Sequence, residues 1–319
     1  MHGEPSDRVG EDPAVPPSME FNLGPIRFGI HRNRPPAPVP EPALPEPIAP
    51  PPPPPETPTP PAPKPPPPGL LHYQCNVCGS PCETQVMFLN REAPSCKHCG
   101  SNVRMRSLMH VLSSVLFSKS IPLPDFPNRK DLKGIGMSCW DGYAIPLAQK
   151  LDYLNTYYHQ EPLFDIRNPP DAWRESLDFV ISSDVFEHIE PPVSVAFDHA
   201  RQLLKPGGVM VFTVPYAEDI EAPTQEHFPE LNDYEVLETN GKFRLKNITQ
   251  DGREQWFDDL VFHGGPGLNL EMRMFGERDL IAELERAGFS VEIWSAPAFE
   301  FGIYWSHRGS LPMVARRIG

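Results

Sequence analysis

Four cysteines in two pairs carry the clearest chemistry in the sequence. The pairs stand in CNVCG and CKHCG, and 17 residues separate the two CxxC units. This spacing is typical of a zinc site, because each CxxC turn points two thiolates at one place and two turns complete a tetrahedron. Since all four positions are cysteine, the predicted zinc is structural, with no open position for catalysis. The predicted ligands are Cys75, Cys78, Cys96 and Cys99, and Cys82 is expected to be a bystander.

A second polar group follows a buried stretch, in SSDVFEHI at 182–189. Asp184 and Glu187 have the spacing of a capping box, which predicts the start of a helix. The D-x-x-E-H set also contains metal-ligand types, but its three groups would have to converge on one side of the helix start, so we favour the cap. A capped helix at the end of a strand would place Ser183 and Asp184 where α/β proteins bind ligands.

A third candidate is GIGMSCWDG, 134–142, which stands between a predicted strand and a predicted helix. Gly134, Gly136 and Ser138 are small, so the backbone of such a turn could approach a ligand closely. The stretch is therefore predicted to be a ligand-binding turn, although two glycines and a serine alone are a weak signature.

The elements that must position these residues alternate between strand and helix over 130–319. DLKGIGMS is predicted to be a strand that passes into a turn at its glycines, and the other predicted strands are DYLNTYY, LFDI, LDFVISS, VMVFTVP and FSVEIW. DVFEHI is predicted to open a helix, and the other predicted helices are DGYAIPLAQKL, VSVAFDHARQLL and ERDLIAELERAG. Strands separated by helices predict an α/β domain whose mostly parallel sheet is covered on both faces. Ligands bind such sheets at the carboxyl ends of the strands.

Other segments precede or interrupt this domain. We expect a proline-rich tail over 1–70, a zinc ribbon over 71–102, a linking helix and loop over 103–129, and an insertion over 216–268. The linking helix is predicted from apolar residues that share one helical face, namely Leu108, Val111, Leu112, Val115 and Leu116. Arg104 and Arg106 are expected on its solvated face.

The tail holds 26 of the 44 prolines in the chain. Proline lacks the N–H that helices and sheets need, and the segment has little apolar bulk, so it is predicted to be a disordered, polyproline-like tether. One exception is MEFNLGPIRFGIHRN, 19–33, whose apolar residues could dock onto another surface.

Charge and hydropathy restrict the class of protein. The formal net charge is −14, which disfavours a nucleic-acid or anionic-membrane partner. The sequence shows no signal-peptide pattern and no apolar run near the length of a membrane span. We therefore predict a cytoplasmic protein, where paired cysteines indicate metal rather than disulfides.

Three motifs in order carry a family resemblance. LDFVISSDVFEHIEPP, LLKPGGVMVFTVP and ERDLIAELERAGFSVEIW together resemble the class I S-adenosylmethionine-dependent methyltransferases over roughly residues 130–295. The resemblance implies a Rossmann-like, seven-stranded sheet whose last strand is antiparallel, with FSVEIW as that strand or its neighbour. It also implies that S-adenosylmethionine is the methyl donor, in addition to the structural zinc that the cysteine spacing predicts.

The resemblance assigns donor-binding positions residue by residue. Gly134, Gly136 and Ser138 stand where the family has an acid and glycines, and a donor without phosphate needs fewer glycines than a dinucleotide. Asn155 and Thr156 stand nearest the position of the family's ribose-binding acid. The remaining implied donor contacts are Asp165 at the adenine, Ser183 and Asp184 beside the cofactor, and His188 at its side. The alternative for Asp165 is an ordinary turn residue.

Methyl transfer needs a base only if the acceptor must lose a proton. The candidate bases by position are His159, Glu161 and His188. The acidic, aromatic-bearing insertion over 216–268, with the Asn-Gly of a tight hairpin, favours a small-molecule or glycan-type acceptor. Two alternatives stay open: an RNA methyltransferase that holds RNA with its ribbon, and a catalytically inactive scaffold. The sequence leaves the oligomeric state open.

Overall fold

The computed structural model describes residues 69–319. The expected tail over 1–70, with its segment 19–33, lies outside the described residues except for positions 69 and 70.

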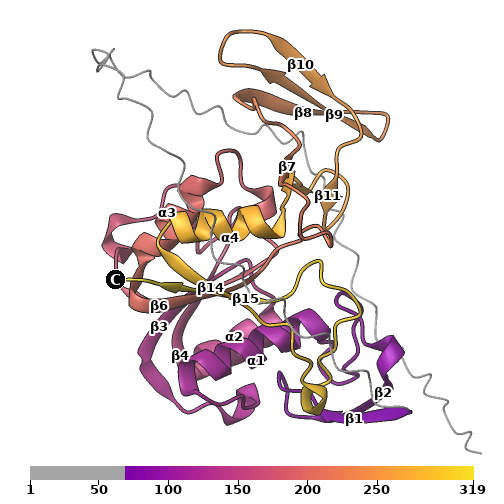
Figure 1. The fold of residues 1–319 in the computed structure, drawn as a ribbon, viewed down its shortest axis with the longest axis vertical. Helices are drawn as coiled ribbons and strands as arrows, with labels where there is room; N and C mark the ends of the chain where they lie inside the picture. Colours follow the sequence, from indigo (N-terminus) through magenta and orange to yellow (C-terminus); the bar gives the residue numbers. More distant parts are fainter. Residues whose placement is uncertain (1–68) are drawn as a thin grey trace, which may run out of the picture. The chain divides into compact units, whose positions relative to one another are not determined.

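Short strands and four α-helices make up the described chain (Figure 1). The helices are α1 (Val103–Phe117), α2 (Asp141–Lys150), α3 (Ser194–Leu203) and α4 (Glu277–Arg286). The strands are β1 (Leu70–Gln74), β2 (Pro81–Gln85), β3 (Arg129–Met137), β4 (Leu151–Thr156), β5 (Leu177–Ser183), β6 (Leu204–Thr213), β7 (Gln225–Glu226), β8 (Asp233–Thr239), β9 (Lys242–Ile248), β10 (Glu254–Phe257), β11 (Phe262–His263), β12 (Asn269–Leu270), β13 (Arg273–Met274), β14 (Phe289–Ile293) and β15 (Met313–Arg317).

The central sheet of the described residues has the strand order β14-β15-β6-β5-β3-β4 (Figure 1). β3 pairs in parallel with β4 and β5, and β5 pairs in parallel with β6. β15 runs antiparallel to both of its neighbours, β6 and β14. The predicted α/β class with a parallel-rich sheet is confirmed. The antiparallel strand is β15, so FSVEIW forms its neighbour, β14.

The sheet has six strands in the described part of the chain, so the expectation of a seven-stranded sheet was wrong. LFDI forms only an isolated bridge between Tyr157 and Leu163. Asp165 Oδ1 accepts a hydrogen bond of 2.8 Å from the backbone N of Arg167, and Asn168 N donates to Asp165 O at 3.0 Å. An aspartate with these contacts folds the chain into a turn instead of extending it.

β3 continues to Met137 and includes Gly134 and Gly136 of GIGMSCWDG, whereas Gly142 lies in α2. The chain leaves the strand at Ser138, whose φ is +52°. A Cβ on Gly134 would lie 2.4 Å from the ring of Phe179, and a Cβ on Gly136 would lie 1.9 Å from Tyr153 Oη. The expectation that these glycines lie in the turn was therefore wrong, because their small size accommodates aromatic side chains of the neighbouring strands.

Separate apolar cores cover the two faces of the sheet. Side chains alternate along each strand, so Val180 and Met210 face one core while Phe179 and Val211 face the other. Helices α3 and α4 contribute to the first core, and α1 and α2 contribute to the second (Figure 1). The expectation of helices on both faces is confirmed.

Helix α1 begins where the cysteine-rich segment ends. Asn102 Oδ1 accepts a hydrogen bond from Met105 N at 2.9 Å and so caps the helix. The apolar face is buried as expected at Leu108, Val111 and Leu112.

The expected solvated position of the two arginines at the start of α1 was wrong. Arg106 is fully buried and donates to the carbonyls of Ser101 (2.8 Å) and Gly302 (2.9 Å). Arg104 points to the sheet edge with a side chain that is only 19% exposed. Buried oxygens on neighbouring segments supply partners for both guanidiniums, and sequence spacing along one helix does not reveal such partners.

The insertion over 216–268 contains a small antiparallel sheet, in the order β10-β9-β8 (Figure 1). The expected hairpin forms at Asn240 and Gly241, both of which have positive φ. The insertion and the chain just after it share a small core of Phe228, Leu245, Leu270 and Met272. None of the described helices combines the length and apolar character that crossing a bilayer requires.

Candidate active site

The turn that follows β3 is held by Asn155 on β4. Asn155 Oδ1 accepts a hydrogen bond of 3.0 Å from Cys139 N, and its Nδ2 donates to Cys139 O at 2.8 Å and to Tyr157 Oη at 2.9 Å. Tyr157 in turn donates to Asp141 at the start of α2, at 3.1 Å. One amide therefore fixes the turn between Ser138 and α2.

Thr156 also contacts β3 instead of pointing to solvent. It is fully buried, and its Oγ1 donates to Gly136 O at 2.8 Å. Asn155 and Thr156, the residues expected near a ribose, thus both use polar atoms to hold β3 and its turn. Sequence position identified the two residues but not these partners.

Asp184 lies at the carboxyl end of β5 with φ of +53°. Its Oδ1 accepts hydrogen bonds from Arg91 Nη2 (2.6 Å) and Thr213 Oγ1 (2.8 Å), and Arg104 Nη1 lies 3.4 Å from its Oδ2. Burial opposes ionisation of this carboxyl, but the guanidiniums of Arg91 and Arg104 outweigh it and hold the pKa below its usual range. Asp184 is therefore an ionised group that hydrogen bonds hold at the sheet edge.

Ser183, next to Asp184 in the sequence, is held by helix α1 through Arg104. Its Oγ accepts a hydrogen bond of 2.6 Å from Arg104 Nη1. The structure thus brings Ser183 and Asp184 together with two arginines that sequence analysis did not place there. The residues next to Arg91 in the sequence form no motif that identifies it as a partner of Asp184, because Asp184 is 93 positions away.

The expected capping box does not form. The chain after Asp184 makes only a 3-10 turn over Phe186–His188, with no side-chain cap at its start. The carboxylate that was expected to cap this turn is bonded to Arg91 and Thr213 instead. The expected helix at DVFEHI was therefore wrong.

The candidate bases come from two different segments of the chain. His159 and Glu161 are exposed in the turn after β4, where Glu161 Oε2 accepts a hydrogen bond from Leu163 N at 3.1 Å. His188 lies in the 3-10 turn after β5, where its Nε2 is 3.7 Å from Glu187 Oε1. Burial lowers the pKa of His188, which keeps its ring neutral near pH 7. Asp165 adopts the turn geometry described above.

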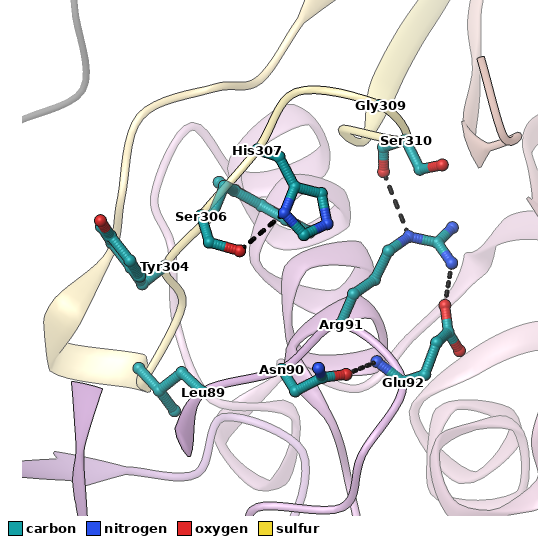
Figure 2. A pocket seen from close by; sticks show the side chains of 10 residues that line it. Leu89, Asn90, Arg91, Glu92, Tyr304, Ser306, His307, Gly309 and Ser310 are labelled. Carbon is teal, nitrogen blue, oxygen red and sulfur yellow. Dashed lines mark hydrogen bonds and ion pairs between the residues drawn. The ribbon is translucent and has the colours of Figure 1, made fainter. Parts of the chain in front are cut away.

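A cavity of about 210 Å³ lies next to Arg91 (Figure 2). Asn90, Arg91 and Glu92 line one side, and the loop 304–310 near the C-terminus lines the other. Arg91 Nε donates to Ser310 O at 3.4 Å, so the arginine that binds Asp184 also forms the wall of this cavity. Sequence analysis did not identify the loop, which carries Tyr304, Trp305, Ser306 and His307.

The four predicted zinc ligands lie together, with their sulfurs all within 4.8 Å of one another. Cys75 Sγ and Cys99 Sγ are 3.7 Å apart, as are Cys78 Sγ and Cys96 Sγ. A zinc ion with Zn–S bonds of about 2.3 Å holds tetrahedral sulfurs about 3.8 Å apart. The donor set and its spacing fit zinc. Cys82 Sγ lies 3.5 Å from Cys96 Sγ, at the edge of this group.

Comparison with known proteins shows which family this chain resembles. The family model described as "Methyltransferase domain" matches residues 126–292. Among solved structures, an S-adenosylmethionine-dependent methyltransferase from Clostridium acetobutylicum is 13% identical, with a TM-score of 0.41 over 69% of this chain and 93% of that one. A 1,6-didemethyltoxoflavin-N1-methyltransferase from Burkholderia thailandensis is 14% identical, with a TM-score of 0.39 over 67% and 78%.

The comparison with curated proteins gives no match. The matched segment 126–292 is more than half of the 319 residues, and it includes the turn after β3, Asp165 and Asp184. The chain therefore belongs to the methyltransferase-domain family.

Proposed function

We propose that the protein is an S-adenosylmethionine-dependent methyltransferase that acts on a small-molecule or glycan-type acceptor. The observation that carries this proposal is the family match over 126–292, which spans the whole carboxyl edge from β3 to β6. Methyl transfer asks little covalent chemistry of the protein, because the donor's sulfonium already activates the methyl group. The chain's task is to hold donor and acceptor in line.

The donor is proposed to lie over the turn 138–140, between Asp165 and Asp184. Ser138 has a positive φ and a small side chain, so the backbone there can approach the methionine part of the donor. One carboxylate oxygen of Asp165 accepts a hydrogen bond within its own turn, and the other has no hydrogen bond among the described residues. That oxygen is available to an adenine amino group.

Gly134, Gly136, Asn155 and Thr156 enter this proposal in a supporting role. Their contacts fix the end of β3 and the turn after it, so they shape the donor site from behind. Ser183 and His188 remain proposed donor-side residues at the end of β5.

The acceptor is proposed to bind in the cavity beside Arg91. At about 210 Å³ the cavity is smaller than the roughly 300–1,000 Å³ of pockets for drug-sized ligands. It combines charged and hydroxyl groups with the aromatic rings of Tyr304 and Trp305. These features support an acceptor the size of a sugar or an amino acid, with polar groups and one apolar face. His159 and Glu161 stay candidate bases.

We further propose that residues 71–102 form a zinc ribbon. The closed set of four cysteines supports a structural ion, and zinc would supply folding energy to a segment that has few apolar residues of its own. Asn76, within the first CxxC turn, donates to Arg106 O at 2.8 Å, so a fixed ribbon also fixes α1.

The proposed acceptor class can be tested with methyl-labelled donor. The protein is incubated with labelled S-adenosylmethionine and, separately, with pools of small hydroxylated or amino compounds, oligosaccharides, and total RNA. We expect label in a small-molecule or oligosaccharide fraction, and less of it with Arg91→Met, which removes the wall of the cavity. Label only in RNA would contradict the acceptor class. Donor binding without transfer to any pool would favour the scaffold alternative.

A further inference from the structure

A second group of metal-ligand side chains lies away from the cysteines. Glu187 and His188 come from the 3-10 turn after β5, and His263 comes from β11 in the insertion. Glu187 Oε1 lies 3.7 Å from His188 Nε2 and 3.9 Å from His263 Nδ1. One ligand atom from each of the three residues lies within 4.8 Å of the other two.

Backbone contacts explain why His188 and His263, which are 75 positions apart in the sequence, lie close together. β11 pairs with β12, where His263 stands opposite Asn269. Two residues beyond β12, Met272 N donates to Glu187 O at 2.8 Å, which holds this segment against the 3-10 turn. The insertion is thus attached to the end of β5 at the point where the three side chains converge.

In each imidazole, the nitrogen that lies within 4 Å of Glu187 is the one that the other contacts of the ring leave unprotonated. His188 Nδ1 donates to Leu270 O at 2.9 Å, which leaves Nε2 unprotonated in the neutral ring. His263 Nε2 lies 2.9 Å from Glu271 Oε2, and this carboxylate favours a proton on Nε2 and a lone pair on Nδ1. Metal-binding histidines are held in this way, with the second nitrogen on a carbonyl or carboxylate.

Glu187 supplies the independent sign that a ligand belongs here. Its side chain is 0% exposed, and neither carboxylate oxygen has a hydrogen-bond partner among the described residues. The contacts of 3.7 and 3.9 Å to the two imidazoles are too long for hydrogen bonds. A buried carboxylate without partners is costly, and a cation shared with the two rings would remove that cost.

We propose that Glu187, His188 and His263 bind one divalent transition-metal ion. Ligand atoms on such an ion, at bonds of about 2.1 Å, stand roughly 3.0–3.5 Å apart. The distances of 3.7 and 3.9 Å from Glu187 Oε1 to the two imidazole nitrogens exceed the upper end of this range by only a few tenths of an ångström. Two imidazoles and one carboxylate suit zinc, iron, manganese or cobalt, whereas calcium and magnesium prefer oxygen ligands alone.

The ion would differ in kind from the cysteine-bound zinc. Three protein ligands leave at least one coordination position for another molecule, as in catalytic metal sites. That position is open to an oxygen ligand such as water or a hydroxyl group. The metal proposal does not rest on the proposed function.

Cobalt titration of the full-length protein tests the site. The protein is first dialysed against a mild chelator until it holds one zinc ion per chain, and Co²⁺ is then followed by calorimetry and visible absorption. We expect one Co²⁺ per chain without a thiolate charge-transfer band. Glu187→Gln and His263→Asn should each weaken binding at least about tenfold, and Glu271→Gln, which releases His263, by about tenfold. His72→Asn, an exposed histidine outside the cluster, should leave Co²⁺ binding unchanged.

Three results would overturn the site: no binding by the wild-type protein near 1 mM Co²⁺, binding only with thiolate absorption, or unchanged affinity in both Glu187→Gln and His263→Asn. If Glu187→Gln does not melt cooperatively, His263→Asn decides, because that side chain is 37% exposed and its replacement leaves no buried hole. No methyl donor is present in the titration, so its failure and a failure of donor binding are separate results.

Discussion

Gly136 leaves no space for a side chain. A Cβ there would lie 1.9 Å from Tyr153 Oη, 2.7 Å from Cys139 Sγ and 2.9 Å from Asn155 Oδ1. The last two of these atoms belong to the turn after β3 and to the residue that holds it. Bulk at position 136 therefore acts on the proposed donor site through the packing behind it.

Gly136→Val is expected to lower the free energy of unfolding by about 3 kcal/mol, the upper end of the usual cost of overpacking a filled core, and to abolish donor binding. Urea unfolding and donor calorimetry measure the two effects. The matched control is Gly252→Ala, where a Cβ meets open space and only the positive φ adds strain, at about 1–2 kcal/mol. Equal losses for both variants would show that the packing at Gly136 is not special.

The cysteines give a second prediction at the scale of single residues. Cys75→Ser combined with Cys96→Ser should eliminate the zinc found by elemental analysis, because one thiolate of each pair is lost. Cys82→Ser should keep one zinc per chain, since Cys82 only approaches Cys96 from outside the group of four. Loss of zinc in the Cys82 variant alone would mean that Cys82 is a ligand in place of one of the four.

Between elements, the main connection at the site is the ion pairing of Asp184. The pair joins the end of β5 to the loop that carries Arg91 and to the first turn of α1 at Arg104. Because the pKa of Asp184 is lowered in the folded state, its ionised form stabilises the fold above the ordinary pKa of about 3.9. That contribution is lost as the pH falls through the folded-state pKa.

Arg91→Met should therefore reduce the free energy of unfolding by about 3 kcal/mol at pH 7, as expected when one partner of a mostly buried pair is removed. The difference from the wild-type protein should shrink as the pH falls below about 3.9. Urea unfolding at several pH values gives both numbers. Arg278→Met is the control, because its pair with Glu221 is exposed on both sides and is worth about 1 kcal/mol or less. A difference that does not change with pH would argue against Asp184 as the partner.

Elements could be predicted from the sequence far better than the site. LDFVISS forms β5 with the predicted bounds because a short apolar run between turn residues determines a buried strand locally. The positions of Ser183 and Asp184 followed from that strand. The partners of Asp184, and the approach of His263 to Glu187, depend on segments about 75 to 95 positions away, and no local pattern encodes such contacts. LFDI failed because the turn chemistry of Asp165 outweighed a weak strand signal.

At the scale of the whole molecule, the described residues 69–319 contain the sheet, both of its cores and all the site residues named above. Deleting residues 1–69 is therefore expected to change the melting temperature by less than about 2 °C, because 1 kcal/mol shifts it by about 2–4 °C in a domain of this size. Differential scanning calorimetry of the two proteins provides the comparison. A large drop would show that the segment 19–33 packs against the domain.

Donor calorimetry tests the central claim most directly. S-adenosylmethionine and its demethylated product are titrated separately into the full-length protein. We expect dissociation constants on the order of 10 µM, equivalent to about −7 kcal/mol. Asp165→Ala should weaken binding about tenfold, as loss of a hydrogen bond to a charged group does, while Asp171→Ala, which is almost fully exposed, should have no effect. If neither ligand binds at about 1 mM, the protein is not an S-adenosylmethionine-dependent methyltransferase and the account is contradicted.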